Sequence, residues 1–217
     1  MQHFKVSIKK QKVMKIGLYF ITSSDFGRTH EELAEAVLKA GVRFIQFREK
    51  RMSTKKMFEV AKRIRKLTWE YSATFVVNDR VDLALAVEAD GVHLGQDDLP
   101  YEVVREIFDG IVGVSTHNVD EAKKAERYAD YISAGPVFRT TTKKDAKEPI
   151  GLEGLKKIVS SVKKPVVAIG GINRHNVEDV LKTGVKGVAV ISAIANTQNP
   201  EKSAKELLEI VKKYLDD

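Results

Sequence analysis

The sequence predicts an α/β protein that folds as a single (β/α)8 barrel. Eight short runs of mainly β-branched and aromatic residues alternate strictly with eight longer amphipathic segments. Strict alternation of this kind indicates a parallel sheet with right-handed crossovers. At about 25 residues per unit, 217 residues accommodate eight units. The competing open nucleotide-binding sheet often carries G-x-G-x-x-G after its first strand, but residues 23–27 read SSDFG.

The strand assignments depend on runs that end at turn residues or at the polar start of a helix. In chain order the predicted strands are residues 16–22 (IGLYFIT), 43–47 (RFIQF), 74–77 (TFVV), 91–94 (GVHL), 111–115 (IVGVS), 131–134 (YISA), 166–169 (VVAI) and 187–191 (GVAVI). The segments between them repeat apolar residues every three or four positions, which is typical of helices packed on a sheet. The predicted helices are residues 31–39, 54–69, 82–86, 101–108, 119–127, 152–161, 176–182 and 201–214.

Composition excludes several classes of protein. The chain has no cysteine, which excludes a disulfide scaffold and a thiolate zinc site, and no apolar run approaches the roughly 18 residues of a membrane helix. The net charge is +7, but the first 15 residues contain five lysines and no acid, so the remainder carries only +2. We therefore expect a basic N-terminal extension (residues 1–13) and one catalytic barrel domain (residues 14–217). The protein is expected to be cytoplasmic, without nucleic-acid or membrane partners, and compatible with a homo-oligomer.

The end of the second predicted strand carries two cations. In such barrels the chemistry lies at the carboxyl ends of the strands. Residues 46–50 read QFREK, and the two-residue repeat places Gln46, Arg48 and Lys50 on one face, with Phe47 and Glu49 on the other. Two cations directed into the barrel mouth suit a phosphate or diphosphate. A surface salt-bridge cluster with a nearby glutamate, Glu49 or Glu31, explains the segment equally well.

Carboxylates follow the next two strands. The third strand ends at Asn78 and Asp79, and the fourth is followed by Asp97 and Asp98. Because the carboxyl ends of parallel strands meet at one rim, these side chains are expected to lie close together. Mg²⁺ is usually bound by one or two carboxylates together with substrate phosphates. A single aspartate such as Asp98 could instead cap the next helix, but the grouping favours a metal site.

The later strands end in loops that suit anions. Residues 135–145 (GPVFRTTTKKD) resemble a flexible anion-binding lid, although an ordinary solvated loop explains them too. Gly170-Gly171 after the seventh strand and Ser192 after the eighth stand where this fold often binds phosphate through backbone N–H groups, although the glycines could simply form a tight turn. Two anion sites opposite one another suggest a condensation that expels pyrophosphate.

The histidines carry less information. His30 stands at a helix start and is expected on the surface, as are His3 and His175. The strand alternation makes His93 a hydrogen-bonded residue of the barrel lining, and His117 is close enough to the fifth strand to reach the mouth. Neither H-E-x-x-H nor G-x-S-x-G occurs, so zinc proteolysis and serine-elbow acyl transfer have no support.

Five segments in order carry a family resemblance. They are residues 46–50 (QFREK), 78–84 (NDRVDLA), 91–98 (GVHLGQDD), 140–143 (TTTK) and 168–172 (AIGGI). Together they resemble the thiamine-phosphate synthase (thiamine-phosphate pyrophosphorylase) family, from about residue 18 to the end. Phe47 replaces a common leucine, and Arg139 replaces a common proline.

The resemblance implies a reaction and a set of roles. Family members join 4-amino-2-methyl-5-hydroxymethylpyrimidine diphosphate to a thiazole ethyl phosphate by a dissociative, Mg²⁺-assisted substitution that releases pyrophosphate. Carried over, the pyrimidine diphosphate would be bound by Gln46, Phe47, Arg48, Glu49, Lys50, Asn78, Ser115 and Lys143. The thiazole phosphate would be bound by Thr140, Thr141, Thr142, Gly171, Ile191 and Ser192. Asp79 and Asp98 would hold Mg²⁺, and the catalytic residues would be Arg48, Lys50, Ser115 and Lys143.

Other functions fit the sequence less well. A thiazole tautomerase shares the barrel but typically lacks the metal carboxylates and the complete TTTK segment. A phosphosugar isomerase would leave Arg48 and Lys50 without a role. A phosphate-ligand-sensing barrel would be expected to have lost the carboxylates, which are present here.

Overall fold

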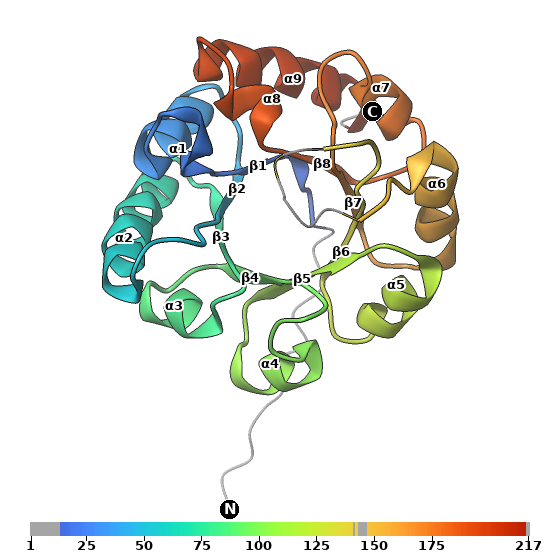
Figure 1. Ribbon diagram of the computed structural model, residues 1–217, viewed down its shortest axis with the longest axis horizontal. Coiled ribbons are helices and arrows are strands. Elements are labelled where there is room, and N and C mark those ends of the chain that lie inside the picture. Colours follow the sequence, from blue (N-terminus) through green and yellow to red (C-terminus); the bar gives the residue numbers. More distant parts are fainter. Residues whose placement is uncertain (1–13, 141, 143–146, 216–217) are drawn as a thin grey trace, which may run out of the picture.

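The computed structural model describes residues 14–140, 142 and 147–215 and forms a closed barrel of parallel strands enclosed by helices (Figure 1). Each strand pairs with the next, and β8 pairs with β1 to close the ring, which confirms the predicted (β/α)8 fold. The strands are β1 (Gly17–Ile21), β2 (Phe44–Phe47), β3 (Thr74–Asn78), β4 (Gly91–Leu94), β5 (Ile111–Thr116), β6 (Tyr131–Ala134), β7 (Val166–Ile169) and β8 (Gly187–Val190). The predicted helices are α1 (His30–Lys39), α2 (Thr54–Glu70), α3 (Val81–Ala86), α4 (Tyr101–Ile107), α5 (Val119–Glu126), α6 (Gly151–Ser161), α7 (Val177–Leu181) and α9 (Pro200–Leu215).

All predicted elements are present, and their ends differ from the prediction by no more than one residue. Two short helices were not predicted: the 3-10 helix η1 (Ser24–Phe26) after β1 and α8 (Ser192–Ala195) after β8. Segments of three and four residues are too short to show a helical repeat in the sequence. An extra short helix after the last strand is a frequent part of phosphate sites in this fold.

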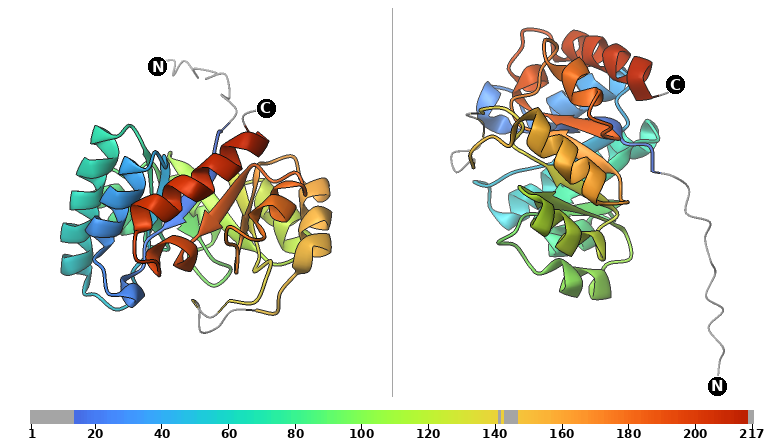
Figure 2. Two further views of the ribbon diagram at one scale, coloured as in Figure 1. Left: turned by 90° about the horizontal axis from the view of Figure 1, so that it is seen from above. Right: turned by 90° about the vertical axis from the view of Figure 1, so that its right-hand side faces the viewer.

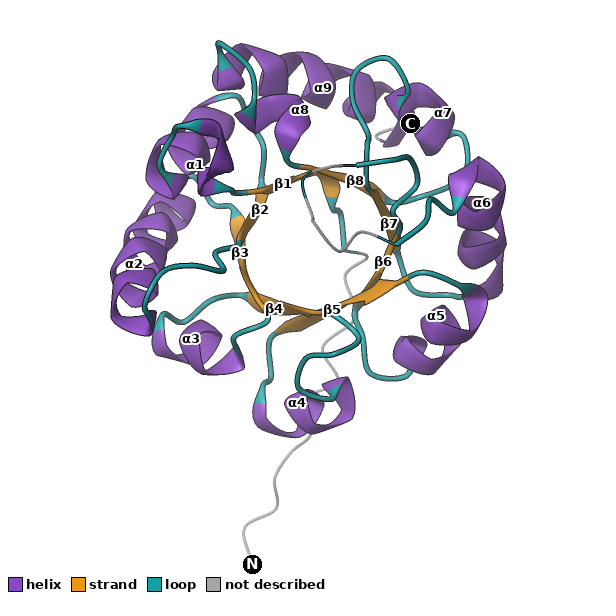
Figure 3. Ribbon diagram, viewed as in Figure 1, coloured by secondary structure: helices purple, strands orange, loops and turns teal. Residues whose placement is uncertain are grey.

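The apolar side chains form two layers of core. The larger layer lies between the strands and the surrounding helices, and the ring arrangement is clear in Figure 3. Helix α9, for example, packs over the outside of β1 between α1 and α7 (Figure 2). The smaller layer fills the barrel interior and includes Tyr19, Phe44, Val76 and Tyr131. No helix in the described ranges is long and apolar enough to span a bilayer.

The barrel interior has room for the Tyr131 ring because β5 carries a glycine beside it. A Cβ atom on Gly113 would lie 2.1 Å from Cζ of Tyr131, a distance that no side chain tolerates. Tyr131 packs edge-on against Phe44 and Tyr19, with ring centroids 5.9 and 6.0 Å away. These rings fill the barrel below the carboxyl ends of the strands and place polar hydroxyls under the rim.

Candidate active site

One pocket of about 590 Å³ lies at the carboxyl ends of the strands and brings most of the predicted site residues together. Its volume falls in the range of ordinary small-molecule sites. The predicted residues that border it are Gln46, Arg48, Lys50, Asn78, Asp79, Asp98, Ser115, Thr140, Thr142, Gly171, Ile191 and Ser192. Thr141 and Lys143 lie outside the described residues.

The end of β2 alternates as the sequence predicted. Gln46, Arg48 and Lys50 border the pocket, with Gln46 buried in the barrel and Lys50 exposed at the mouth. Phe47 and Glu49 do not border it: both are buried on the opposite face, Phe47 within the apolar core. Their side chains are therefore turned away from a molecule in the pocket, and only their backbone can face it.

The alternative of a salt-bridge cluster between the β2 cations and a nearby glutamate does not occur in the described residues. Glu49 is bound by a histidine of α1, and Glu31 pairs with an arginine of α2. Lys50 instead pairs with Asp79, another pocket residue. Within the described part of the chain the Arg48 guanidinium has no ion pair or side-chain hydrogen bond, so its five N–H groups are available to an anion.

Asp79 and Asp98 meet at the rim, as predicted. Asp79 follows β3 with a left-handed backbone (φ 59°), a conformation that aspartate adopts more readily than most residues, and its N–H donates to the His93 carbonyl (2.8 Å). Asp98 accepts a hydrogen bond from the Gly95 N–H (2.6 Å). Burial and the adjacent Asp79 carboxyl raise the pKa of Asp98, which indicates that two negative charges in these positions repel one another.

The helix-capping alternative for Asp98 does not hold. The residue at the start of α4 is Pro100, and no side chain caps that helix. Two repelling carboxylates beside an open pocket suit Mg²⁺, which needs one or two protein oxygens and takes the remaining ligands from phosphates and water. Among the described residues no group of three or more His, Cys, Asp or Glu side chains could form a complete protein cage for a metal.

A chain of buried hydrogen bonds crosses the barrel beneath the pocket. The Gln46 amide donates to the Tyr19 hydroxyl (2.6 Å), which bonds the Tyr131 hydroxyl (2.9 Å). Tyr131 bonds Nδ1 of His93 (2.9 Å), and Nε2 of His93 bonds the Ser115 hydroxyl (2.8 Å). Burial lowers the pKa of His93 to about 4, so the ring is neutral at neutral pH, with one nitrogen donating and the other accepting. The chain links Gln46 and Ser115, two residues predicted to bind the same substrate.

The histidines divide between confirmed and wrong predictions. His93 is a hydrogen-bonded lining residue and His117 borders the pocket, both as predicted. The surface assignment of His30 is wrong, because its side chain is 1% exposed and lies between Thr22 (2.7 Å) and Glu49 (3.0 Å). The reason is that His30, at the start of α1, faces the end of β2, where the buried Glu49 provides a polar partner.

The loop after β6 contributes Lys147, a pocket residue for which the sequence predicted no role. Lys147 borders the pocket, with its ammonium group 3.6 Å from Glu121 and 3.2 Å from Nδ1 of His117. The sequence feature that could have indicated Lys147 is its position just after the lysine-rich loop of the predicted lid. Arg139, which replaces a common proline, is exposed and does not border the pocket.

The glycines after β7 form a tight turn and also allow a close approach. Gly170 and Gly171 have φ values of 100° and 65°, in the left-handed region. A Cβ on Gly171 would lie 2.6 Å from the carbonyl oxygen of Arg139, and one on Gly170 would lie 2.4 Å from Cβ of Pro136. The Phe138 N–H donates to the Gly170 carbonyl (3.0 Å). The glycines thus seat the loop after β6 beside the pocket, and anion binding by their backbone stays a prediction.

Comparisons with known proteins agree on one family. A family model described as thiamine monophosphate synthase matches residues 18–194. A thiamine-phosphate synthase of Archaeoglobus fulgidus is 63% identical over 199 residues, covering 92% of this chain and 95% of that protein. A thiamine-phosphate synthase of Pyrococcus furiosus is 52% identical over 203 residues, covering 93% and 97%. A solved structure of thiamine phosphate pyrophosphorylase from P. furiosus superposes with a TM-score of 0.88 at 50% identity, covering 93% of this chain and 98% of that one.

Proposed function

The chain belongs to the thiamine monophosphate synthase family and is a transferase, and we propose that it joins 4-amino-2-methyl-5-hydroxymethylpyrimidine diphosphate to a thiazole ethyl phosphate. The products are thiamine phosphate and pyrophosphate. The observation that supports this best is that a single pocket has a charged side and a side formed by a glycine turn and a helix start. Charged side chains from the loops that follow β2, β3 and β4 line one side, and the glycine turn after β7 and the start of α8 lie on the opposite side of the ring.

The proposed reaction needs no protein nucleophile. The bond between the pyrimidine methylene carbon and the diphosphate oxygen breaks, and its electron pair leaves with pyrophosphate. The lone pair of the thiazole nitrogen then forms the new carbon–nitrogen bond. Arg48 and Lys50, which border the pocket, would stabilise the negative charge that grows on the departing diphosphate. The resemblance assigns the same task to Lys143. Asp79 and Asp98 would hold Mg²⁺, which adds positive charge at the leaving group.

The buried side of the pocket would hold the pyrimidine ring. Gln46, Asn78 and Ser115 present polar groups there, and the first and last are joined by the hydrogen-bonded chain through His93. A neutral His93 adds no positive charge beside a developing carbocation. Positioning of two rings and exclusion of water are then the main contributions of the protein.

The proposal is tested by mixing the purified protein with both substrates and Mg²⁺ and by measuring thiamine phosphate as fluorescent thiochrome. We expect product that disappears with EDTA and returns with excess Mg²⁺. Arg48→Ala should lower kcat/KM by about 10²-fold or more if Arg48 stabilises the leaving group, whereas Arg63→Ala on the outer face of α2 should not. A folded protein that binds the thiazole phosphate but forms no product would contradict the proposal and favour a tautomerase or a sensing barrel.

A further inference from the structure

We propose that Glu49 is a positioning residue, whose outward-facing carboxylate fixes the strand-end backbone that directs Arg48 and Lys50 into the pocket. The inference rests on the proposed function, because it explains how the diphosphate site is built. A glutamate between two cations at a polyanion site otherwise works against binding, since its negative charge repels the ligand.

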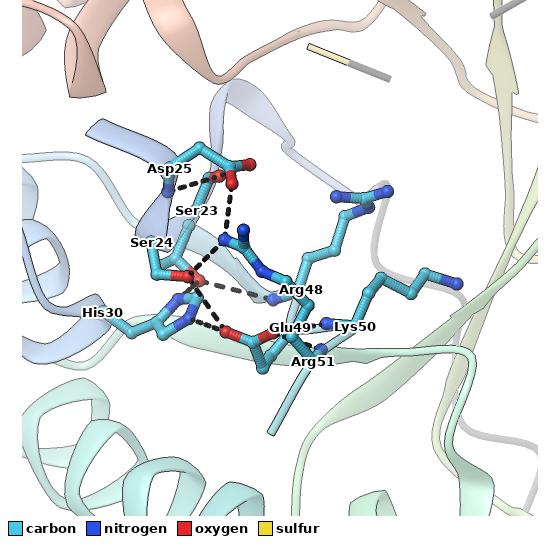
Figure 4. A network of polar contacts seen from close by, with 9 residues as sticks. Ser23, Ser24, Asp25, His30, Arg48, Glu49, Lys50 and Arg51 are labelled. Atoms are coloured by element: carbon cyan, nitrogen blue, oxygen red, sulfur yellow. Dashed lines mark hydrogen bonds and ion pairs between the residues drawn. The ribbon is translucent and has the colours of Figure 1, made fainter. Parts of the chain in front are cut away.

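Each carboxylate oxygen of Glu49 has two hydrogen-bond contacts with other groups of the protein (Figure 4). The side chain is 3% exposed. Oε1 accepts hydrogen bonds from the backbone N–H groups of Lys50 (2.7 Å) and Arg51 (2.6 Å). Oε2 accepts from the Ser24 hydroxyl (3.0 Å) and lies 3.0 Å from Nε2 of His30, which carries a proton because a carboxylate only accepts. The carboxylate therefore ties the end of β2 to η1 and α1.

A second contact ties the preceding residue to the same histidine. The Thr22 hydroxyl accepts from the Arg48 backbone N–H (3.3 Å) and lies 2.7 Å from Nδ1 of His30. The Thr22 backbone N–H in turn donates to the Gln46 carbonyl (2.9 Å). The backbone is thus held at Gln46, Arg48 and Lys50 by groups that lie outside the pocket.

The two cations themselves have few restraints. The Arg48 side chain has no polar partner within the described part of the chain, and Lys50 is 53% exposed and pairs with Asp79. Figure 4 shows both side chains extending away from the Glu49–His30 cluster. Arg48 has no side-chain partner among the described residues, and Lys50 has only the exposed pair with Asp79, so the reach of both side chains depends mainly on the position of their Cα atoms. The contacts of Glu49 therefore determine where the cations reach.

Replacement of Glu49 by glutamine separates positioning from simple charge. If the glutamate acts only through its charge, Glu49→Gln removes a repulsive group and pyrophosphate binds more tightly. If it positions the backbone, the amide group cannot accept from the four donors at once, one N–H group faces another, and pyrophosphate binds more weakly. The two hypotheses predict effects of opposite sign.

The experiment measures pyrophosphate binding by calorimetry in the presence of Mg²⁺. We expect binding to Glu49→Gln to be at least about tenfold weaker than to the wild type, and Ser24→Ala, which removes a single donor, to weaken it by about threefold. The matched control is Glu31→Gln, because Glu31 pairs with Arg63 on the helix surface and should leave affinity unchanged. Unchanged or tighter binding by Glu49→Gln would overturn the proposal.

Kinetics provide a readout that general destabilisation would not give. Glu49→Gln should raise KM for the pyrimidine diphosphate and leave KM for the thiazole phosphate unchanged, since Gly171 and Ser192 lie on the other side of the pocket. If Glu49→Gln fails to fold, as judged by circular dichroism, the affinity of Ser24→Ala for pyrophosphate decides whether Glu49 positions the backbone.

A wild type that binds pyrophosphate without making thiamine phosphate would refute the proposed function, and the affinities of the variants would still decide the role of Glu49. No binding of pyrophosphate by the wild type would overturn the inference itself.

Discussion

The hydrogen-bonded chain beneath the pocket offers a sharp test through Tyr131→Phe. The substitution deletes one buried hydroxyl and keeps the aromatic ring that fills the barrel. In the wild type this hydroxyl bonds the Tyr19 hydroxyl and Nδ1 of His93, each at 2.9 Å. Its loss leaves two buried polar groups each without one partner, at a depth that water does not reach easily: Tyr19 and Tyr131 are fully buried, and His93 nearly so.

The expected cost follows from these two groups. A buried polar group that loses its partner costs about 1–3 kcal/mol, and the smaller desolvation of phenylalanine offsets part of that. We therefore expect the free energy of unfolding to fall by about 3 kcal/mol, which lowers Tm by about 6–12 °C in a chain of this size. Ser115 also loses its oriented His93 partner. If the less well oriented Ser115 hydroxyl raises the activation free energy by about 1.4 kcal/mol, kcat/KM for the pyrimidine diphosphate falls about tenfold.

Urea unfolding and steady-state kinetics measure these effects, and Tyr101→Phe is the matched control. The Tyr101 hydroxyl is also buried but has no hydrogen-bond partner among the described residues. Its removal should leave stability unchanged or raise it by about 1 kcal/mol. Equal effects of the two substitutions, or a Tyr131→Phe protein as stable and active as the wild type, would refute the reasoning.

Three further predictions concern the rim. Asp79→Asn removes the carboxyl that, together with burial, raises the pKa of Asp98, so an NMR titration should show that pKa lowered, and the Mg²⁺ concentration for half-maximal activity should rise at least about tenfold. Gly171→Ala places a side chain at φ 65° and 2.6 Å from the Arg139 carbonyl, so KM for the thiazole phosphate should rise about tenfold, with a smaller change for the diphosphate. Burial opposes ionisation of Glu49, but its hydrogen bonds prevail and lower its pKa from 4.5 to about 2. This group therefore stabilises the fold above pH 4.5 and loses that effect as the pH falls to 2; urea denaturation should show the wild type losing about 3 kcal/mol more than Glu49→Gln over this range.

The fold was predictable because its signals are local. Each strand is a short β-branched run and each helix an amphipathic repeat, so element ends could be placed to within a residue. The exceptions follow from length: η1 and α8 are shorter than any repeat that could reveal them. The order of the strands around the ring follows from the alternation once eight units and the absence of the glycine-rich turn favour a closed barrel over an open sheet.

The site was predictable where residues stand at the carboxyl ends of strands, because these ends meet at one rim: Asp79 and Asp98 were expected together and lie together. The two-residue repeat correctly separated Arg48 and Lys50 from Glu49, but it does not show what Glu49 binds. Its partners Ser24 and His30 stand 25 and 19 residues away and meet it only in the folded barrel. The pair of hydroxyls at Tyr19 and Tyr131, 112 residues apart, has no signal in the sequence for the same reason.

The balance of charge around the pocket explains why a glutamate near its mouth must face outward. Among the described residues, the formal charges that border the pocket are three cations and three carboxylates: Arg48, Lys50, Lys147, Asp79, Asp97 and Asp98. These charges cancel, so they provide no net attraction for a diphosphate and a phosphate. In the proposed function two of the carboxylates, Asp79 and Asp98, would hold a divalent cation, which would add positive charge beside the leaving group. Glu49 has no such role, and in the pocket it would make the sum negative. Its burial against His30 and the backbone removes that charge from the site and uses it to hold the cations in place.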